Sequence, residues 1–304
     1  MELLWILVFV ASLAALVKSS DYFTESAERL GIHFGIPSFI VGVTIVAVGT
    51  SLPELISSLF AVYKGSSEIV FGNAVGSNIA NIFLVLGAAA VIGKNFKIKH
   101  RILDVDLPLL VGSAFLLTIF AWDGQFTAME GILSLIALVI YLAYTFQTEG
   151  IEAEKKDGQP LKETIILIVS GVFIFLGAHF TIESVIQISR IFQIGTELIA
   201  VSAIALGTSL PELMVTFQAA RKGNPEIAVG NVLGSNIFNT LAVMGIPALF
   251  STLIITEEML YFSLPVMLMA TVLYFFMTQD RKMTRWEGYL LLLFYVVFLI
   301  KIIS

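Results

Sequence analysis

Long apolar segments with short polar interruptions follow one another along almost the whole chain. A helix that crosses the hydrocarbon core of a membrane needs roughly 20 apolar residues, and tilt allows somewhat fewer or more. One longer polar stretch, 147–161, separates the apolar segments into two groups. The pattern predicts an all-α polytopic membrane protein with ten transmembrane helices, at about 3–30, 37–63, 68–92, 106–121, 127–146, 162–189, 195–221, 226–250, 258–277 and 286–303.

The composition also favours a membrane protein. Hydrophobic residues make up 58% of the chain and charged residues 13%, whereas a soluble domain carries about 25% charged residues. The absence of cysteine excludes disulfides, thiolate metal sites and cysteine catalysis. The apolar stretch Leu3 to Val17 is compatible with a signal peptide, but no Lys or Arg precedes it. We interpret it as the first helix of the mature protein, with cleavage as the lesser alternative.

The second half of the chain repeats the first. The hexapeptide Gly-Thr-Ser-Leu-Pro-Glu at 49–54 occurs again at 207–212, an offset of 158 residues. The same offset relates Glu25-Ser26 to Glu183-Ser184, Lys64-Gly65 to Lys222-Gly223, Gly72-Asn73 to Gly230-Asn231, Gly76-Ser77-Asn78-Ile79 to Gly234-Ser235-Asn236-Ile237, and Asn81 to Asn239. Farther along the chain the offset becomes 157, as for Leu107-Pro108 and Leu264-Pro265. We expect two related halves, 1–146 and 162–304, joined by the linker 147–161.

An odd number of helices in each half requires the second half to enter the membrane in the opposite sense, so the repeats should be inverted. Basic residues are enriched in cytoplasmic loops. With the N-terminus outside, the outer face holds only Lys64, Arg190 and Lys301. The inner face then holds the other 14 of the 17 basic residues: Lys18, Arg29, Lys94, Lys97, Lys99, Arg101, Lys155, Lys156, Lys162, Arg221, Lys222, Arg281, Lys282 and Arg285. We expect a multi-pass cell-membrane protein with both termini outside and the linker in the cytoplasm.

Glu54 and Glu212 lie inside apolar segments. An ionisable side chain at the bilayer centre costs roughly 2.5–3.5 kcal/mol on insertion scales, and such residues usually serve a function. Two carboxylates at matching positions indicate one shared cation site between the halves. We also expect Pro53 and Pro211 to loosen their helices, because proline lacks an N–H and clashes with the carbonyl four residues before it.

Oxygen-bearing side chains accompany the carboxylates at helical spacing. Thr50 and Glu54 are four residues apart and so share one helix face, as do Thr208 with Glu212, Ser77 with Asn81, and Ser235 with Asn239. Ca²⁺ and Na⁺ prefer oxygen ligands, and the lack of His and Cys in these stripes disfavours Zn²⁺ and Cu⁺ but leaves Mn²⁺ open. One Ca²⁺, two Na⁺ or two H⁺ would neutralise two ionised carboxylates, and such competition is typical of an exchanger.

Other features have plainer interpretations. A single proline, serine or threonine in a membrane helix commonly serves bending or packing, but duplication of the whole set makes that interpretation the weaker one here. We expect Gly72, Gly76, Gly230 and Gly234 to permit close helix contacts, and we expect His100 to be solvated in a cytoplasmic loop. No Walker loop, zinc-protease motif or basic nucleic-acid surface is present, and no obligatory protein partner is evident.

These motifs resemble the α-repeats of the cation/Ca²⁺ exchanger superfamily, and they are most similar to those of prokaryotic Na⁺/Ca²⁺ exchangers. The resemblance covers the whole chain through GTSLPE and GNxxGSNI in each half. Proton-coupled members often carry GNAxE, whereas this chain has Gly76 and Gly234 in place of that glutamate. The resemblance implies a secondary antiporter that exchanges Ca²⁺ for Na⁺ across the cell membrane by alternating access, in which helices 1 and 6 slide across the others, and it implies no enzymatic activity and no cofactor.

The resemblance also implies a ligand set. Glu54 and Glu212 would bind Ca²⁺ together with the carbonyls of Thr50 and Thr208. Na⁺ would use the same carboxylates together with Ser51, Ser77, Ser209, Ser235 and the carbonyls of Ala47 and Ala205, while Asn81 and Asn239 would complete the middle of the site. Some K⁺-carrying relatives have Asp at the position of Asn239, so the neutral side chain here argues against K⁺ dependence.

Three alternatives remain at this point. A Ca²⁺/H⁺ antiporter is the main one, because protons can neutralise the same carboxylates. A passive cation channel is less favoured, because channels usually take their selectivity from a ring of subunits. An intramembrane enzyme ranks last, because neither a nucleophile nor a metal motif accompanies the carboxylates.

Overall fold

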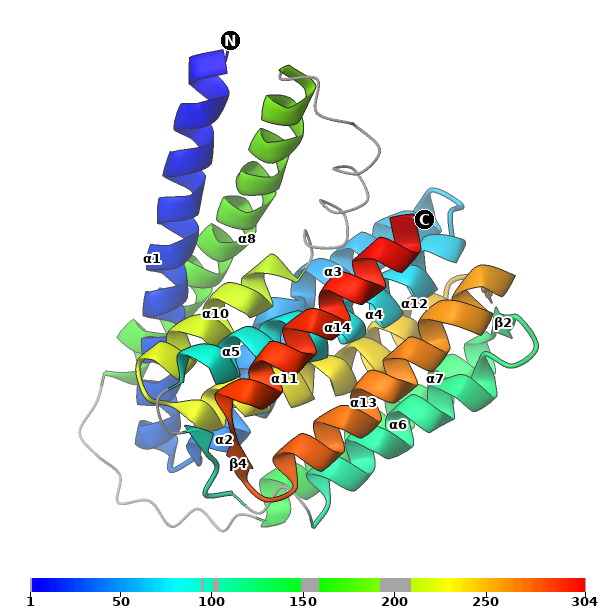
Figure 1. Ribbon diagram of the computed structural model, residues 1–304. Helices are drawn as coiled ribbons and strands as arrows, with labels where there is room; N and C mark the ends of the chain where they lie inside the picture. The colour runs from blue at the N-terminus through cyan, green and yellow to red at the C-terminus, as the bar shows by residue number, and fades with distance from the viewer. Residues whose placement is uncertain (1, 94–95, 101–103, 149–158, 192–208, 304) are drawn as a thin grey trace.

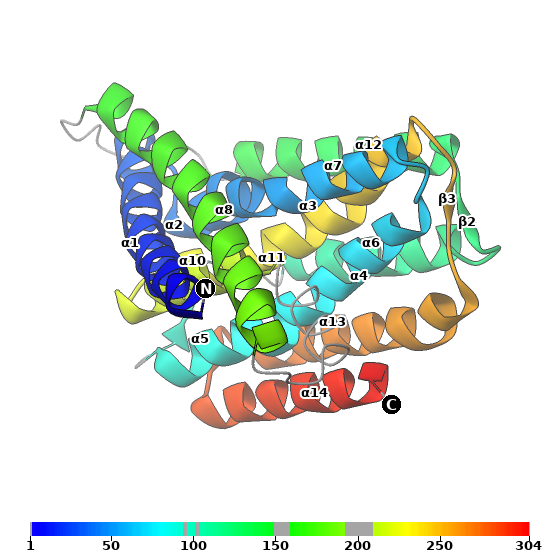
Figure 2. The same cartoon turned by 90° about the horizontal axis from the view of Figure 1, so that it is seen from above.

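Two long helices lie side by side at one edge of the molecule (Figures 1 and 2). They are α1 (Glu2–Phe34) and α8 (Pro160–Ile191). The start of α1 lies at the same end as the end of α8, so the two helices run antiparallel. Thr181 on α8 donates a hydrogen bond of 2.9 Å to the hydroxyl of Ser12 on α1. This computed structural model describes residues 2–93, 96–100, 104–148, 159–191 and 209–303.

The remaining helices form a bundle beside this pair (Figure 1). Several contain a π-helical turn, labelled η, which is rare and occurs mostly at functional positions. The first half contributes α2 (Ser38–Val41), η1 (Gly42–Val46), α3 (Ala47–Tyr63), α4 (Glu68–Ala80), η2 (Asn81–Leu86), α5 (Gly87–Ile92), α6 (Asp106–Phe120) and α7 (Ala128–Thr148). The second half contributes α10 (Leu210–Arg221), α11 (Pro225–Phe238), η3 (Asn239–Val243), α12 (Met244–Ala248), η4 (Met259–Ser263), α13 (Leu264–Thr278) and α14 (Arg285–Ile303).

Two very short antiparallel strand pairs join loops from opposite halves, which the all-α prediction did not include. β1 (Phe96–Lys97) pairs with β4 (Lys282–Met283), and β2 (Gln125–Phe126) pairs with β3 (Leu253–Ile254). They form because loops distant in sequence lie side by side and can satisfy each other's backbone hydrogen bonds. The sequence offset of 157 relates the first residue of β1 to that of β3, and the first residue of β2 to that of β4.

Among the described residues, seven helices are long and apolar enough to cross a membrane. They are Leu4–Phe34, Ser38–Tyr63, Glu68–Ile92, Ala128–Thr145, Pro160–Ile188, Pro225–Ala248 and Met259–Thr278. Three other expected spans correspond to α6, α10 and α14; α6 is a shorter apolar helix, and the span that ends with α10 begins outside the described residues. The structure is thus a mostly helical protein of membrane type, and the count of ten spans remains a prediction.

The continuous helical stretch from α11 through η3 to α12 is the most enclosed of the candidate spans. In its most apolar 18-residue window 94% of the residues are buried, against 11% for α1. The polar groups that α11 carries are therefore shielded from both lipid and water. They must find partners inside the protein, because an unpaired buried polar group is costly.

Two glycines on α11 permit its close approach to the first half. A Cβ added at Gly234 would lie 2.3 Å from the carbonyl oxygen of Val43, and one added at Gly230 would lie 2.5 Å from that of Phe39. The predicted packing role is confirmed for both. For Gly76, the counterpart of Gly234, it stays a prediction, because Val201 and Ala205, the counterparts of the Val43 and Ala47 that Gly234 faces, lie outside the described residues.

Candidate cation site

The two copies of the repeated hexapeptide meet inside the protein. Ser51 on α3 donates a hydrogen bond of 3.0 Å from its hydroxyl to Oε1 of Glu212 on α10. Glu54, one helical turn after Ser51, has no exposed surface, and Glu212 is only 1% exposed. The fold therefore buries two carboxylates from different halves of the chain and links their helices through one of them.

Helix α11 brings further oxygen atoms to the same region. Thr50 on α3 donates a hydrogen bond of 3.2 Å to Oδ1 of Asn231 on α11. Ser235, one turn later on α11, donates to the same Oδ1 at 3.5 Å. All three side chains are buried. The structure thus joins Ser51 to Glu212, and Thr50 to Asn231 and its neighbour Ser235. The Ser51–Glu212 and Thr50–Asn231 contacts each link residues more than 150 positions apart in sequence.

Each of two π turns begins at an asparagine singled out by the repeat. Asn81 begins η2 and Asn239 begins η3, and both are buried. Neither side-chain amide has a hydrogen-bond partner among the described residues. Buried amides are normally paired, so two such exceptions at matching positions need an explanation. A cation could interact with their Oδ1 atoms.

The stretches that carry these asparagines contact each other. Asn78 on α4 donates a hydrogen bond of 2.9 Å to the hydroxyl of Thr240, the residue after Asn239. Ser77, the neighbour of Asn78, is buried on α4 one turn before Asn81. The contact places the GNxxGSNI motif of the first half against the same motif of the second half.

Four other expected ligands have different outcomes. Thr208 and Ala205 lie outside the described residues. The carbonyl oxygen of Ala47 accepts a bond of 3.3 Å from the hydroxyl of Thr50, so it already faces this polar region. Ser209 is buried at the start of α10, and its hydroxyl has no hydrogen-bond partner among the described residues.

The expected loosening at Pro53 is wrong. Helix α3 runs through Pro53 without a break, and Pro211 lies in the first turn of α10, where a missing N–H is tolerated. Proline removes only one backbone hydrogen bond from α3, and the residues on both sides of Pro53 remain helical. The departure from α-helical geometry instead occurs at η1, before α3, where no proline is present.

Two asparagines that sequence reasoning treated only as part of a signature have specific roles in the packing. Asn73 donates 3.0 Å hydrogen bonds to the carbonyl of Glu54 and to the hydroxyl of Ser58. Asn231 donates a 2.8 Å bond to the hydroxyl of Thr216, the counterpart of Ser58. Each amide therefore joins a carboxylate-bearing helix to the next helix. Their duplication in GNxxGSN was the signal that could have identified them.

The charge of the site comes from its carboxylates. Within the described ranges, no group of three or more His, Cys, Asp or Glu side chains is arranged to hold a metal ion. Hydroxyl and amide oxygens supply the other polar atoms. Two buried carboxylates surrounded by neutral oxygens suit hard cations. Burial makes uncompensated charge expensive, so cations or protons are needed to neutralise the site.

Another buried carboxylate, that of Asp106, lies away from this site, next to a histidine that we expected to be solvated. His100 stacks on Phe39 with ring centroids 4.2 Å apart, and its Nε2 lies 3.1 Å from Oδ2 of Asp106. Tyr141 donates a 3.2 Å bond to the same carboxylate. The expectation for His100 is wrong, because its ring stacks on Phe39 and contacts Asp106 instead of facing solvent.

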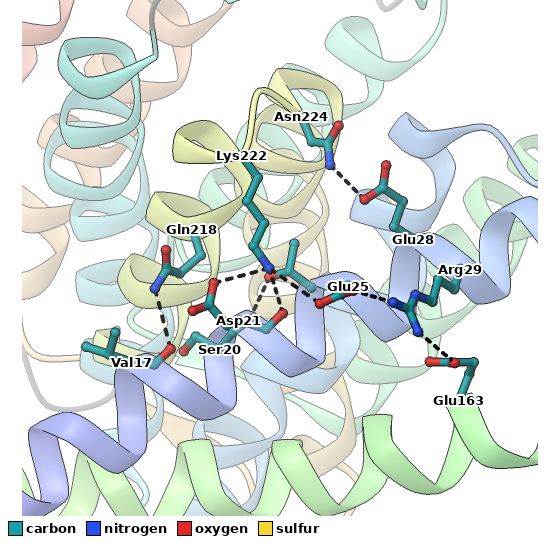
Figure 3. A network of polar contacts seen from close by, with 11 residues as sticks. Val17, Ser20, Asp21, Glu25, Glu28, Arg29, Glu163, Gln218, Lys222 and Asn224 are labelled. Atoms are coloured by element: carbon teal, nitrogen blue, oxygen red, sulfur yellow. Dashed lines mark hydrogen bonds and ion pairs between the residues drawn. The ribbon is translucent and has the colours of Figure 1, made fainter.

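Two interfaces that the repeat offset relates differ in structure. Between α3 and α8 lies a cavity of about 350 Å³, and Thr50 and Pro211 are among its lining residues. At the counterpart interface, α1 contacts α10 through polar groups that bridge the helices directly (Figure 3). The two halves are therefore not in equivalent conformations, and the cavity reaches the region of the buried carboxylates on one side.

Comparisons with known proteins agree with this arrangement. The sodium/calcium exchanger protein family matches residues 4–147 and 162–303. The sodium/calcium exchanger MaX1 of Methanosarcina acetivorans is 33% identical, with 97% of each chain covered. The inner membrane protein YrbG of Escherichia coli K12 is 33% identical, with 80% of this chain and 79% of its own covered.

A solved structure shows the same similarity in three dimensions. The sodium-calcium exchanger NCX_Mj, soaked with Na⁺ and Sr²⁺, superimposes with a TM-score of 0.87 at 31% identity, and 98% of each chain is covered. The family match extends over nearly the entire chain, in two segments that each contain one copy of the hexapeptide. The chain belongs to the sodium/calcium exchanger family.

Proposed function

We propose that this protein is a secondary antiporter that exchanges Ca²⁺ for Na⁺ across the cell membrane by alternating access. The observation that carries the proposal is the contact between the repeated hexapeptides, in which Ser51 holds the buried carboxylate of Glu212 while Glu54 lies buried one turn away. Removing the cations would leave buried carboxylates uncompensated, which costs free energy. One set of cations must therefore replace another, which is the behaviour of an exchanger.

The ligands of the proposed site follow the repeat. Glu54 and Glu212 bind Ca²⁺ with the carbonyls of Thr50 and Thr208. Na⁺ takes the same carboxylates together with Ser51, Ser77, Ser209, Ser235 and the carbonyls of Ala47 and Ala205, and Asn81 and Asn239 complete the middle of the site. The burial of every side chain of this set that lies in the described residues supports the assignment. So do the two matching π turns with their unpaired amides.

The proposed architecture is ten transmembrane helices in two inverted repeats, 1–146 and 162–304, with both termini outside and the linker 147–161 in the cytoplasm. The antiparallel α1 and α8 are the first helices of the two halves, which supports inversion. The paired strands and the π turns recur at the same sequence offsets. Most of the linker lies outside the described residues.

Alternating access is supported by the unequal interfaces. A cavity lies between α8 and α3, whereas hydrogen bonds and ion pairs bridge the counterpart helices α1 and α10. If the pair α1 and α8 slides across the bundle, closing one interface would open the other. Lipid contacts are consistent with such motion, since both helices expose many apolar side chains.

The test is Ca²⁺ uptake into proteoliposomes under an imposed Na⁺ gradient, then under an H⁺ gradient without Na⁺, each with and without K⁺. Uptake that requires the Na⁺ gradient but not K⁺ is expected. Uptake that follows only the pH gradient would establish the Ca²⁺/H⁺ alternative instead. A requirement for K⁺ would show that the neutral Asn239 was misinterpreted, and Ca²⁺ flux without any counter-ion gradient would indicate a channel.

A further inference from the structure

A polar network joins the second half of α1 to the end of α10 (Figure 3). The ammonium of Lys222 lies 3.1 Å from the carboxylate of Asp21 and 3.9 Å from that of Glu25, and it donates a 3.1 Å hydrogen bond to the carbonyl of Asp21. We call Asp21, Glu25 and Lys222 the latch. Because its members come from two helices, it holds those helices together in this conformation.

Neighbouring contacts reinforce the latch. Asn224 donates a 2.8 Å bond to the carboxylate of Glu28, and Gln218 donates a 3.4 Å bond to the carbonyl of Val17. Arg29 pairs with Glu25 on its own helix and with Glu163 on α8 at 3.2 Å (Figure 3). The network therefore ties α10 to α1 and, through Arg29, α1 to α8.

The counterpart interface cannot form the same network. The repeat offset places Lys64 opposite His179 and Glu183, so a lysine and one glutamate are kept but the aspartate is not. Two further positions of the network become apolar, since Gln218 corresponds to Phe60 and Glu28 to Ile186. The cavity lies at this second interface. Sequence and structure thus show the same asymmetry.

We infer that Lys222 is a conformation-setting residue of the transport cycle, and that the latch makes the state with α1 closed on α10 the preferred one. The inference rests on the proposed alternating access. Two inverted repeats of equal sequence would give two states of similar free energy, so a contact available in only one state shifts their ratio. Within the described residues, no hydrogen bond or ion pair joins the latch to a predicted cation ligand, so the latch acts on which state is populated.

The expected size of the effect follows from exposure. The side chains of Lys222 and Asp21 are 33% and 30% exposed, so water and salt weaken the pairing. Partly exposed ion pairs change an equilibrium by about two- to fivefold. A shift of that size is sufficient to redistribute two states that are otherwise close in free energy.

The experiment measures the opening of the α1–α10 interface directly. Gln218→Cys places a unique thiol at a position that is 1% exposed and in contact with α1, because the chain has no other cysteine. The purified full chain in detergent is labelled with a water-soluble thiol reagent without Ca²⁺. We expect Lys222→Gln to speed labelling about two- to fivefold, and Lys222→Arg to stay close to the parent. Salt at about 1 M should reduce the difference, because it shortens the screening length to about 3 Å.

The mirror variant and a distant reporter provide the controls. Lys64→Gln should leave labelling of the Gln218→Cys reporter unchanged, since its interface has no latch. A second reporter, Ser134→Cys on α7, is also buried and should label no faster with Lys222→Gln. Equal labelling with and without Lys222, an equal effect of Lys64→Gln, or faster labelling at both reporters would each overturn the inference. Labelling needs no transport, so an absence of Na⁺-driven flux would refute the exchange while leaving the latch standing.

Discussion

The hydroxyl of Ser51 and the carboxylate of Glu212 are 161 residues apart in sequence and 3.0 Å apart in space. The bond joins the third residue of one hexapeptide to the last residue of its copy. It shows how a repeat can make one site from two sequence copies: each copy can supply a carboxylate, and the other copy can supply the hydroxyl that orients it. The burial of both residues means that the bond forms away from water, where it is strengthened.

Glu54→Gln and Glu212→Gln should each lower Ca²⁺ transport by about 10- to 100-fold, the effect of losing an interaction with a charged group. The amide keeps the shape of the side chain, so the protein should remain folded. Ca²⁺ flux into proteoliposomes measures the loss, and Glu68→Gln at the exposed start of α4 is the control. Near-normal flux in either buried variant would remove that residue from the site.

Ser51→Ala should weaken Ca²⁺ transport more than Ser209→Ala. The hydroxyl of Ser51 donates to the carboxylate of Glu212, whereas that of Ser209 has no partner among the described residues, so Ser51→Ala leaves Glu212 without that donor. A bond to a charged group contributes about 1.5–3 kcal/mol, which predicts an apparent affinity at least about tenfold lower. The measurement is the half-saturating Ca²⁺ concentration for transport, compared between the two variants. Equal effects would mean that the bond is unimportant for ion binding.

Asn231→Ala should destabilise the protein by about 1–3 kcal/mol, because Thr50, Ser235 and Thr216 all lose a buried partner. Thr216→Val should cost less, since it breaks only one of these bonds. Thermal unfolding in detergent measures both. In the double variant the effects should not add, because the two residues share a bond. Fully additive losses would argue against the network.

Gly234→Ala tests the close packing of α11, with Gly112→Ala on α6 as the control. The methyl group at Gly234 would lie 2.3 Å from the carbonyl oxygen of Val43, so α11 must move, at a cost of about 1–3 kcal/mol. At the exposed Gly112 no described atom lies within 4 Å of an added Cβ, and alanine should be neutral or slightly stabilising. The difference in melting temperature between the variants is the measurement. Similar melting temperatures would contradict the packing.

Single cysteines can test the topology, because the chain has none of its own. A cysteine at Glu154, which lies outside the described residues, should resist an impermeant thiol reagent in intact cells, and one at the exposed Gln125 should react. Permeabilised cells provide the control, since both positions should then react. The opposite pattern in intact cells would reverse the assignment of the two faces.

The protein class and the location of its important carboxylates could be predicted from the sequence. Helices occupy each expected range within the described residues, because lipid leaves a long apolar segment little choice other than a helix. Glu54 and Glu212 were identifiable because charge is rare in such segments and because the hexapeptide is duplicated. Local pattern was less informative about helix geometry: the proline at Pro53 does not break α3, and the π turns begin at Asn81 and Asn239.

The sequence by itself therefore determined a membrane protein with two related halves and a pair of buried carboxylates. Only the tertiary structure decided which groups meet. Ser51 contacts Glu212, and Asn231 joins Thr50 to Thr216. Lys222 pairs with Asp21, whereas the other half has His179 at the position that corresponds to Asp21. Helical periodicity specifies the face on which a side chain lies, but it contains no information about which distant helix covers that face. That choice depends on the packing of all the helices together, including close approaches such as the one that Gly234 permits.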